Sequence, residues 1–305
     1  MKIFTAEIAL LACLVLGARN GSSILLTEDC GTAKHPSRVR RVVGGEDANR
    51  FANPWMVLVL GQFGDFICGG SLITRLFVLT SASCLMSPPK QVVLGEYNRN
   101  CTTADCISSR QVIDVDSRFI HDEFNMTSVD KKYDIGLIRL ARKVLISDHV
   151  RPICLSVDRR VGRTARYLTA TGWGGTYFTE RSNILQKVTL MKLDRRSCTG
   201  LFRIKLDASQ LCVGGLHRDT CFGDSGGPLT AKSHMDGREH GNRKSRTFLV
   251  GMVSFGSRSC SGVGVYTNVE HYMDWIVNAI SKSNMYSSQD HHLRESTSQS
   301  TSVTN

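Results

Sequence analysis

The residues around position 225 are of the types expected around a nucleophilic serine. Ser225 follows Asp224, and glycines stand at positions 223, 226 and 227. Because glycine has no Cβ atom, such a turn lets backbone N–H groups converge on one point. Converging N–H groups can stabilise the negative charge that develops on a carbonyl under attack. The segment therefore indicates acyl-transfer chemistry, provided that a second group accepts the proton of the serine hydroxyl.

Motifs elsewhere in the chain match those of a known family. They are VVGGE at 42–46, CGGSLI at 68–73, DIGLI at 134–138, TGWG at 171–174, VSFG at 253–256 and GVYT at 264–267. With the Ser225 segment, they resemble the secreted trypsin-like serine proteases of the chymotrypsin fold, most closely the arthropod members and their inactive homologues. The resemblance extends from Val42 to about Ile280 and implies an all-β fold of two antiparallel six-stranded barrels with a C-terminal helix.

The resemblance also implies roles for individual residues. Ser225 matches the nucleophile, and the N–H groups of Gly223 and Ser225 match the oxyanion hole. Asp134 matches the carboxylate that orients the catalytic histidine, and Ser254 matches a residue that hydrogen-bonds this carboxylate. These positions describe a site that lacks only its base.

The position of the catalytic histidine is occupied by Ser83. The alignment is fixed by Cys68 and Cys84, whose spacing is that of the disulfide around the family's histidine loop, and none of the nine histidines matches the position. A hydroxyl does not accept a proton at neutral pH as an imidazole does. Loss of the histidine alone costs roughly 10⁶ in turnover in a serine protease. We therefore expect a pseudoprotease, in which water or the Ser83 hydroxyl occupies the space beside Asp134.

Further positions of the resemblance concern substrate binding and activation. Asp219 matches the floor of a pocket for Arg or Lys, close to Ser254, and Gly256 and Gly264 match its walls. Val263 departs from the usual proline, so the pocket's shape is less determined than its charge. Cleavage between Arg41 and Val42 would free an α-amino group that pairs with Asp224 in the family.

The cysteine count indicates a disulfide-bonded, secreted protein. Of 11 cysteines, Cys13 lies in an apolar N-terminal run, and the remaining even number favours disulfides over a metal site, since no CxxC pair occurs. The resemblance assigns Cys30–Cys154, Cys68–Cys84, Cys198–Cys212 and Cys221–Cys260, and leaves Cys101 to pair with Cys106. Glu96 matches a calcium-loop position of some relatives, but the rest of that loop departs from their pattern, so we expect no cofactor or metal.

The chain divides into four expected parts. Residues 1–18 are typical of a signal peptide, 19–41 of a short prosegment, 42–282 of the protease-like domain, and 283–305 of a disordered Ser/Thr-rich tail. No other stretch is long and apolar enough to span a membrane. Asn125 and Asn100 begin glycosylation sequons, although a disulfide at Cys101 would hinder the second.

Short strands must position these residues. Runs rich in β-branched residues at 55–60, 77–80, 111–115, 136–140 and 248–253 predict strands. The stretch from Val269 to Ile280 places Tyr272, Met273 and Ile276 on one face and predicts a helix. The pattern is typical of all-β barrels rather than of an α/β fold.

The charge and the family context leave three functions open. The leading one is a secreted binding or regulatory component of an extracellular proteolytic cascade, with a protease, inhibitor or other protein presenting Arg or Lys as partner, a role that the resemblance suggests. The second is a weakly active trypsin-like endopeptidase. The third is a polyanion-binding module, suggested by the net charge of +11 and the basic run from Lys232 to Arg246. Nothing resembles a nucleic-acid reader.

Overall fold

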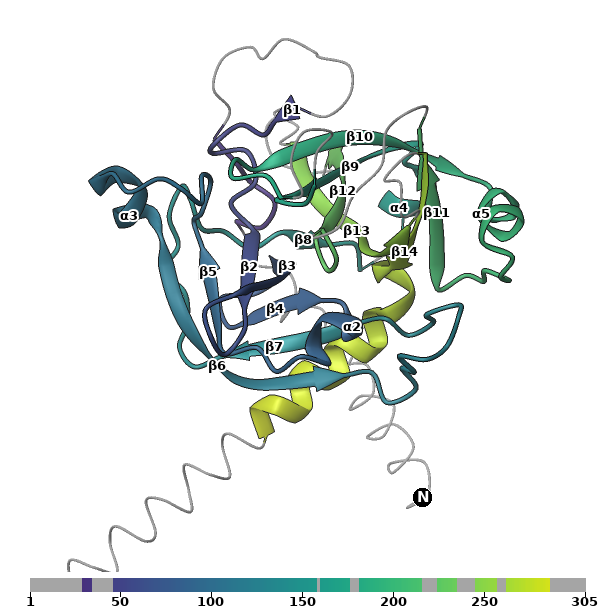
Figure 1. Cartoon of the computed structure of the whole chain (residues 1–305), viewed down its shortest axis with the longest axis horizontal. Helices are drawn as coiled ribbons and strands as arrows, with labels where there is room; N and C mark the ends of the chain where they lie inside the picture. The colour runs from purple at the N-terminus through teal and green to yellow at the C-terminus, as the bar shows by residue number, and fades with distance from the viewer. Residues whose placement is uncertain are drawn as a thin grey trace, which may run out of the picture.

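The computed structural model consists of two β-barrels side by side, crossed by a C-terminal helix (Figure 1). It describes residues 29–34, 46–157, 160–175, 181–215, 224–234, 245–256 and 262–285. This is the two-barrel architecture of the chymotrypsin fold, as the sequence predicts.

The first barrel is a closed ring of six antiparallel strands in the order β2-β3-β4-β7-β6-β5. Its strands are β2 (Met56–Leu60), β3 (Phe66–Leu72), β4 (Phe77–Thr80), β5 (Gln91–Leu94), β6 (Gln111–Ile120) and β7 (Gly136–Leu140). Valine, leucine and isoleucine fill its interior, and every residue of β4 is buried. In β6, buried and exposed positions largely alternate, because one face of this strand contacts the core and the other contacts solvent.

The second barrel closes because β9 pairs with both β10 and β12. Its strands are β9 (Tyr167–Gly172), β10 (Gln186–Leu193), β11 (Gln210–Gly214), β12 (Pro228–His234), β13 (Ser245–Gly256) and β14 (Val263–Asn268). Two short strands extend it: β1 (Glu46–Asp47) pairs with β10, and β8 (Cys154–Leu155) runs parallel to β13. Short helices connect the strands of the two barrels: α2 (Ala82–Leu85), α3 (Ala104–Ser109), α4 (Val161–Thr164) and α5 (Arg195–Phe202).

The C-terminal helix follows the second barrel in sequence but packs against the first. It begins as a 3₁₀ turn, η1 (Val269–Tyr272), and continues as an α-helix over residues 273–285. Tyr272, Met273, Ile276 and Ile280 are buried, and they share a hydrophobic cluster with the first barrel. The helix predicted from Val269 to Ile280 is therefore present, and it adds an apolar contact between the barrels.

Four of the five predicted disulfides are present: Cys30–Cys154, Cys68–Cys84, Cys101–Cys106 and Cys198–Cys212. The fifth pair, Cys221 and Cys260, lies outside the described residues, as do the predicted signal peptide, the Arg41–Val42 bond and most of the Ser/Thr-rich tail. Among the described residues, no helix is long and apolar enough to cross a membrane.

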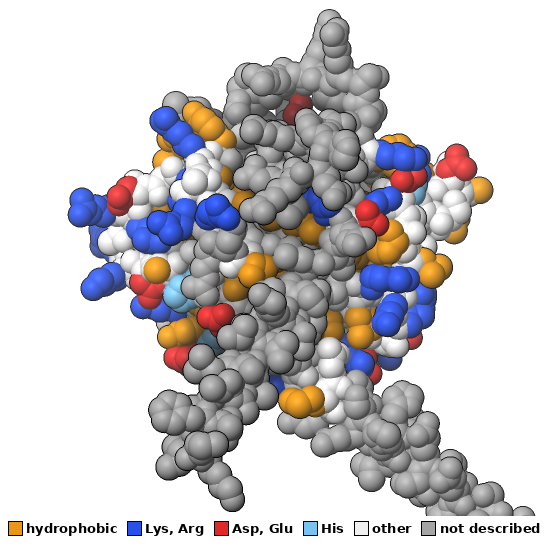
Figure 2. Space-filling model, turned by 180° about the vertical axis from the view of Figure 1, so that it is seen from behind, with side chains coloured by type: hydrophobic (Ala, Val, Ile, Leu, Met, Phe, Trp, Pro, Cys, Tyr) orange, Lys and Arg blue, Asp and Glu red, His pale blue; other side chains and the backbone are white. Residues whose placement is uncertain are grey.

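Residues 29–34, from the predicted prosegment, are fastened to the second barrel. Gly31 exchanges two backbone hydrogen bonds, donating to Pro152 and accepting from Thr247. Its φ of +64° and a backbone oxygen 2.3 Å from where a Cβ would stand explain why glycine is needed there. Arg246 donates to the carbonyl of Cys30 at 3.1 Å, so this member of the basic run serves an internal contact. Elsewhere, Lys and Arg side chains gather at the left and right of the face in Figure 2, in keeping with the net charge of +11.

Candidate active site

Asp134 is held at the entrance of β7 with its side chain buried. Only 1% of its surface is exposed. The backbone reaches it through a tight turn in which Tyr133 has a φ of +60°. From the second barrel, the hydroxyl of Thr267 donates to the Asp134 carbonyl at 2.8 Å. Both barrels therefore fix the carboxylate at the position where they meet.

Ser83 lies in α2 and contacts this carboxylate twice. Its backbone N–H donates to Asp134 Oδ1 at 2.8 Å, and its hydroxyl donates to Oδ2 at 3.2 Å. The hydroxyl of Ser81 caps α2, and the Cys68–Cys84 disulfide fastens the helix to β3. The predicted contact between the Ser83 hydroxyl and Asp134 is therefore present.

Ser254 supplies the remaining donor, from β13 of the second barrel. Its hydroxyl lies 2.5 Å from Asp134 Oδ2. Burial raises the pKa of the Asp134 carboxyl, and the hydrogen bonds from Ser254 and Ser83 act in the opposite direction without cancelling it. The carboxylate is thus held by serine hydroxyls and one backbone N–H, where a catalytic triad would provide an imidazole.

Ser225 lies in a turn that is pressed against the first barrel. Its carbonyl accepts the N–H of Gly69 in β3 at 2.9 Å, and the N–H of Gly226 donates to Val253. Gly226 has a φ of +75°, and a Cβ there would meet the Thr80 hydroxyl at 2.2 Å and the N–H of Ser81 at 3.2 Å. The turn therefore abuts the segment that leads into α2, and the fold brings Ser225, Ser83 and Asp134 into one region.

Asp224 is packed against two glycines of the TGWG motif. Its Oδ1 accepts the N–H of Gly174 at 2.9 Å. A Cβ at Gly172 would stand 1.9 Å from the same oxygen, and one at Gly174 would stand 2.5 Å from the carboxylate. From the sequence, Asp224 was predicted to pair with the α-amino group of Val42, and its contact with these two glycines was not predicted. The one sequence feature that pointed to the contact is that the glycines flank Trp173 in the TGWG motif.

Comparison with known proteins identifies the family. The sequence profile of the trypsin family matches residues 42–276. The chain belongs to the trypsin family. It is 36% identical over 259 residues to CLIP domain-containing serine protease B15 of Anopheles gambiae, covering 77% of this chain and 68% of that one. It is 33% identical over 284 residues to phenoloxidase-activating factor 1 of Holotrichia diomphalia, covering 85% and 74%.

A solved structure supports the same assignment. The Drosophila Grass clip serine protease of the Toll pathway superposes with a TM-score of 0.72 at 29% identity, covering 85% of this chain and 77% of that one. The spaetzle-processing enzyme of Drosophila melanogaster is 35% identical over 267 residues, covering 77% of this chain and 65% of that one. The protein is thus a trypsin-like member of the group that includes the insect CLIP-domain serine proteases.

In this trypsin-family chain, the walls of the expected primary pocket are partly described. Gly256 in β13 and Gly264 in β14 are direct partners in the antiparallel register, so the two small residues face each other across one strand pair. The Ser254 hydroxyl, also expected near the pocket, is directed to Asp134. Asp219 and Gly223 lie outside the described residues.

The described histidine side chains are engaged elsewhere. The ring of His121 stacks on Trp275 with centroids 5.4 Å apart, His149 lies 4.9 Å from Phe51, and His271 lies 5.0 Å from Tyr272. The Asp134 carboxylate interacts with the side chains of serines and with the charge of Lys131, and with none of these three histidines. Within the described part of the chain, none of these three imidazoles takes the place of the missing base.

The remaining predicted sites lie on the surface of the first barrel. Asn125 is exposed, and its side-chain oxygen accepts two hydrogen bonds from Thr127 of the same sequon. Asn100 is also exposed but is followed by the disulfide-bonded Cys101. The described residues contain no group of three or more His, Cys, Asp or Glu side chains that could hold a metal ion.

Proposed function

We propose that this protein is a noncatalytic trypsin-family member that binds protein partners rather than cleaving them. The observation that carries this proposal is the pair of hydrogen bonds from Ser83 to Asp134. The position that should present a base to Ser225 instead presents a hydroxyl that donates its own proton to the carboxylate. A serine hydroxyl is too weak a base at neutral pH to take the proton of the Ser225 hydroxyl, as an imidazole would.

The expected loss of rate is large enough to exclude a protease role. Removing the histidine of a serine protease lowers turnover by roughly 10⁶, and leaves about 10³–10⁴ over water from the oxyanion hole and binding. Because Ser225 and Asp134 lie in one region without a base, we expect the site to capture a ligand rather than to hydrolyse it. Its expected ligand is an Arg or Lys side chain reaching Asp219.

An extracellular regulatory role is supported by the relatives and the disulfides. The spaetzle-processing enzyme, phenoloxidase-activating factor 1 and the Grass protease of the Toll pathway are named for places in proteolytic pathways. The four described disulfides suit an oxidising compartment. We therefore propose that the protein is secreted and binds a protease, inhibitor or substrate of such a pathway.

The decisive experiment restores the base with Ser83→His. Wild type and variant are cut at the Arg41–Val42 bond, the new N-terminus is verified by mass spectrometry, and hydrolysis of fluorogenic Arg and Lys peptides is measured. The variant should gain at least about 10³-fold in kcat/KM. A Ser83→His/Ser225→Ala double variant cut in the same way reports any contaminating protease.

Binding is tested separately from catalysis with benzamidine, a small cation that resembles the arginine side chain. Calorimetry on the cut wild type should show one binding site, and Asp219→Asn should abolish it. Wild-type cleavage at a rate near that of Ser83→His would refute the noncatalytic assignment, in favour of a working endopeptidase. Absence of benzamidine binding would refute the proposed capture of a basic side chain.

A further inference from the structure

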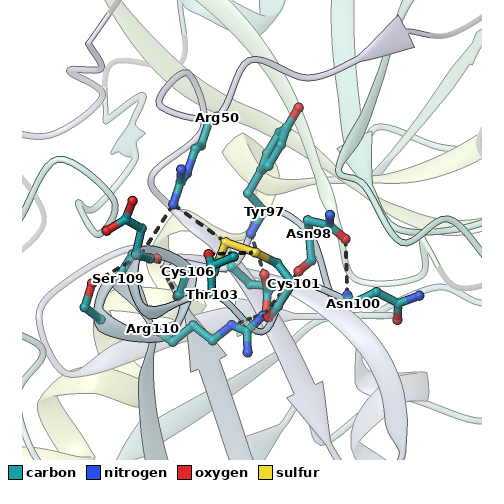
Figure 3. Close-up of a disulfide and its surroundings, with 12 residues drawn as sticks. Arg50, Tyr97, Asn98, Asn100, Cys101, Thr103, Cys106, Ser109 and Arg110 are labelled. Carbon is teal, nitrogen blue, oxygen red and sulfur yellow. Dashed lines mark hydrogen bonds and ion pairs between the residues drawn. A yellow bond between two sulfur atoms is a disulfide. The ribbon is translucent and has the colours of Figure 1, made fainter.

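The loop that joins β5 to β6 is organised around one arginine. It contains α3 and the Cys101–Cys106 disulfide, and it ends at Arg110, whose side chain turns back under the loop (Figure 3). The loop also contains Glu96, which the resemblance matches to a calcium-loop position.

Three oxygen atoms converge on the Arg110 guanidinium. Its Nε lies 2.6 Å from Glu96 Oε2, and one of its terminal nitrogens donates to the carbonyls of Asn98 at 3.2 Å and Cys101 at 2.8 Å. Only 6% of the Glu96 side chain and 22% of the Arg110 side chain is exposed. The charge is therefore held inside the loop, in contact with a carboxylate and two backbone oxygens.

This donor set is of the kind that a calcium ion takes. Ca²⁺ binds carboxylate and carbonyl oxygens, and it needs six to eight of them at about 2.3–2.6 Å. Here the guanidinium occupies the centre of the set, and a divalent ion placed there would meet a fixed positive charge. We infer that Arg110 is the permanent cation of this loop and replaces a metal ion, so that the loop is ordered without calcium.

The order of this loop matters for the fold, because the loop connects the first barrel to the second through hydrogen bonds. The Tyr97 carbonyl accepts the N–H of Leu185 at 2.9 Å and the indole N–H of Trp173 at 3.3 Å. The next residue, Asn98, forms an isolated β-bridge with Ile184. Trp173 immediately precedes Gly174, whose N–H holds Asp224 beside Ser225. The cation at Arg110 therefore supports a contact that leads to the candidate active site.

A second arginine that contacts this loop, Arg50 from the segment between β1 and β2, provides a matched control. Arg50 approaches α3 from the opposite side, with a terminal nitrogen 3.5 Å from the Asp105 carbonyl and 3.9 Å from Cys106 Sγ. These contacts are longer than those of Arg110, and no carboxylate is paired with Arg50 among the described residues. Removing its charge should have little effect on the loop.

The experiment measures the unfolding temperature of the full chain in EDTA and in 5 mM CaCl₂, together with calcium binding by calorimetry. Wild type should give the same Tm in both solutions, within about 1 °C, and no binding heat. Arg110→Gln removes the ion-pair partner of the buried Glu96 carboxylate, and it should lower Tm by about 6–15 °C in EDTA. Arg50→Gln should change Tm by no more than about 3 °C.

The charge-reversed variant Arg110→Glu should create a metal site in this loop. It supplies a second carboxylate, so calcium should raise its Tm and bind with a Kd of about 10⁻⁴–10⁻³ M, the range of extracellular calcium modules. Calcium-dependent recovery of a variant that is unfolded in EDTA counts as the same result.

Two results would overturn the inference. One is calcium binding by wild type that disappears in Glu96→Gln, because the loop would then hold a metal despite Arg110. The other is an Arg110→Gln variant as stable in EDTA as Arg50→Gln, because the guanidinium would then contribute nothing as a cation. Both measurements are independent of whether Arg110→Glu folds, and neither depends on hydrolytic activity.

Discussion

Replacing Asp134 by Asn should make this protein more stable at neutral pH. In a working triad the carboxylate faces an imidazole that can carry positive charge, but here its hydrogen-bond donors among the described residues are Ser83 and Ser254. An amide of the same shape can keep these contacts, because its oxygen accepts from the Ser83 N–H and its NH₂ donates to hydroxyls, which accept as well as donate. The substitution therefore removes a buried charge and keeps a hydrogen bond at each contact of the carboxylate.

The sign of the effect follows from the direction of the pKa shift. Burial raises the pKa of Asp134 even after the opposing hydrogen bonds, so the charged form costs stability in the folded state. Each tenfold weakening of the acid corresponds to about 1.4 kcal/mol. For a domain of this size, each kcal/mol of that cost corresponds to about 2–4 °C in Tm, so removing the charge should raise Tm.

The difference between variant and wild type should depend on pH in one direction. Below the unfolded pKa, near 3.8, folded and unfolded wild type both hold the proton, and the variant gains nothing. As pH rises, the unfolded chain releases its proton first, so wild type loses stability relative to Asp134→Asn. The difference reaches its full size once pH exceeds the raised pKa of the folded state and then stays constant.

The assay is the Tm of both proteins, followed by circular dichroism from pH 3.5 to 8. Taking the difference at each pH cancels the titration of all other groups. Ser254→Ala serves as the control: it should lower Tm in wild type by more than in the Asp134→Asn background, because a hydrogen bond to a charged group is the stronger one. A variant less stable than wild type at pH 7, or a difference that does not vary with pH, would refute this reasoning.

Three further substitutions test the packing at Gly226, with Gly200 as its control, and the ion pair of Asp207. Gly226→Ala places a Cβ 2.2 Å from the Thr80 hydroxyl at a φ of +75°, and should lower Tm by at least about 4 °C. The control Gly200→Ala, in the exposed helix α5 with nothing within 4 Å of the new Cβ, should raise Tm slightly. Equal effects of the two substitutions on Tm would contradict the packing described. Burial acts to raise the pKa of Asp207, but hydrogen bonds and the ammonium of Lys132 hold it at about 2. An acid whose pKa is lower in the folded than in the unfolded state stabilises the folded state above the unfolded pKa. Asp207→Asn should therefore lower Tm at pH 6, and this loss of Tm should disappear as pH falls from about 4 to 2. A Tm difference between wild type and variant that stays constant over that pH range would contradict this prediction.

Much of the fold could be predicted from local patterns. The strands expected at 77–80 and 136–140 match β4 and β7 in their bounds, and the expected run at 111–115 is the first half of β6. These segments are rich in apolar and β-branched residues, so burial and local preference agree. Helices α3 and α5 were not predicted, because their sequences are short and largely polar, and their formation depends on the disulfide and loop contacts that surround them.

The candidate site was predictable only in part, because its contacts depend on residues that are distant in the sequence. The motifs specified which residues are present, including serine in place of histidine at position 83. They predicted water or the Ser83 hydroxyl beside Asp134, but not that the Ser83 backbone N–H would donate as well, nor that Gly172 and Gly174 would make room for Asp224. Arg110 carried no motif at all, and its role emerged only when Glu96 was found beside it.

The sequence by itself determined the chemical inventory: a serine in a glycine-rich turn, a carboxylate, a missing imidazole and cysteines in even number. These are properties of residue types and spacing, which a linear pattern can record. The tertiary structure decided which groups satisfy one another. Hydrogen bonds and ion pairs in the interior join residues that are 51 positions apart, in the case of Ser83 and Asp134, or 120 apart, in the case of Asp134 and Ser254. Such partners are selected by the closure of the barrels, because each buried polar atom must find a donor or acceptor among the side chains that folding brings within reach.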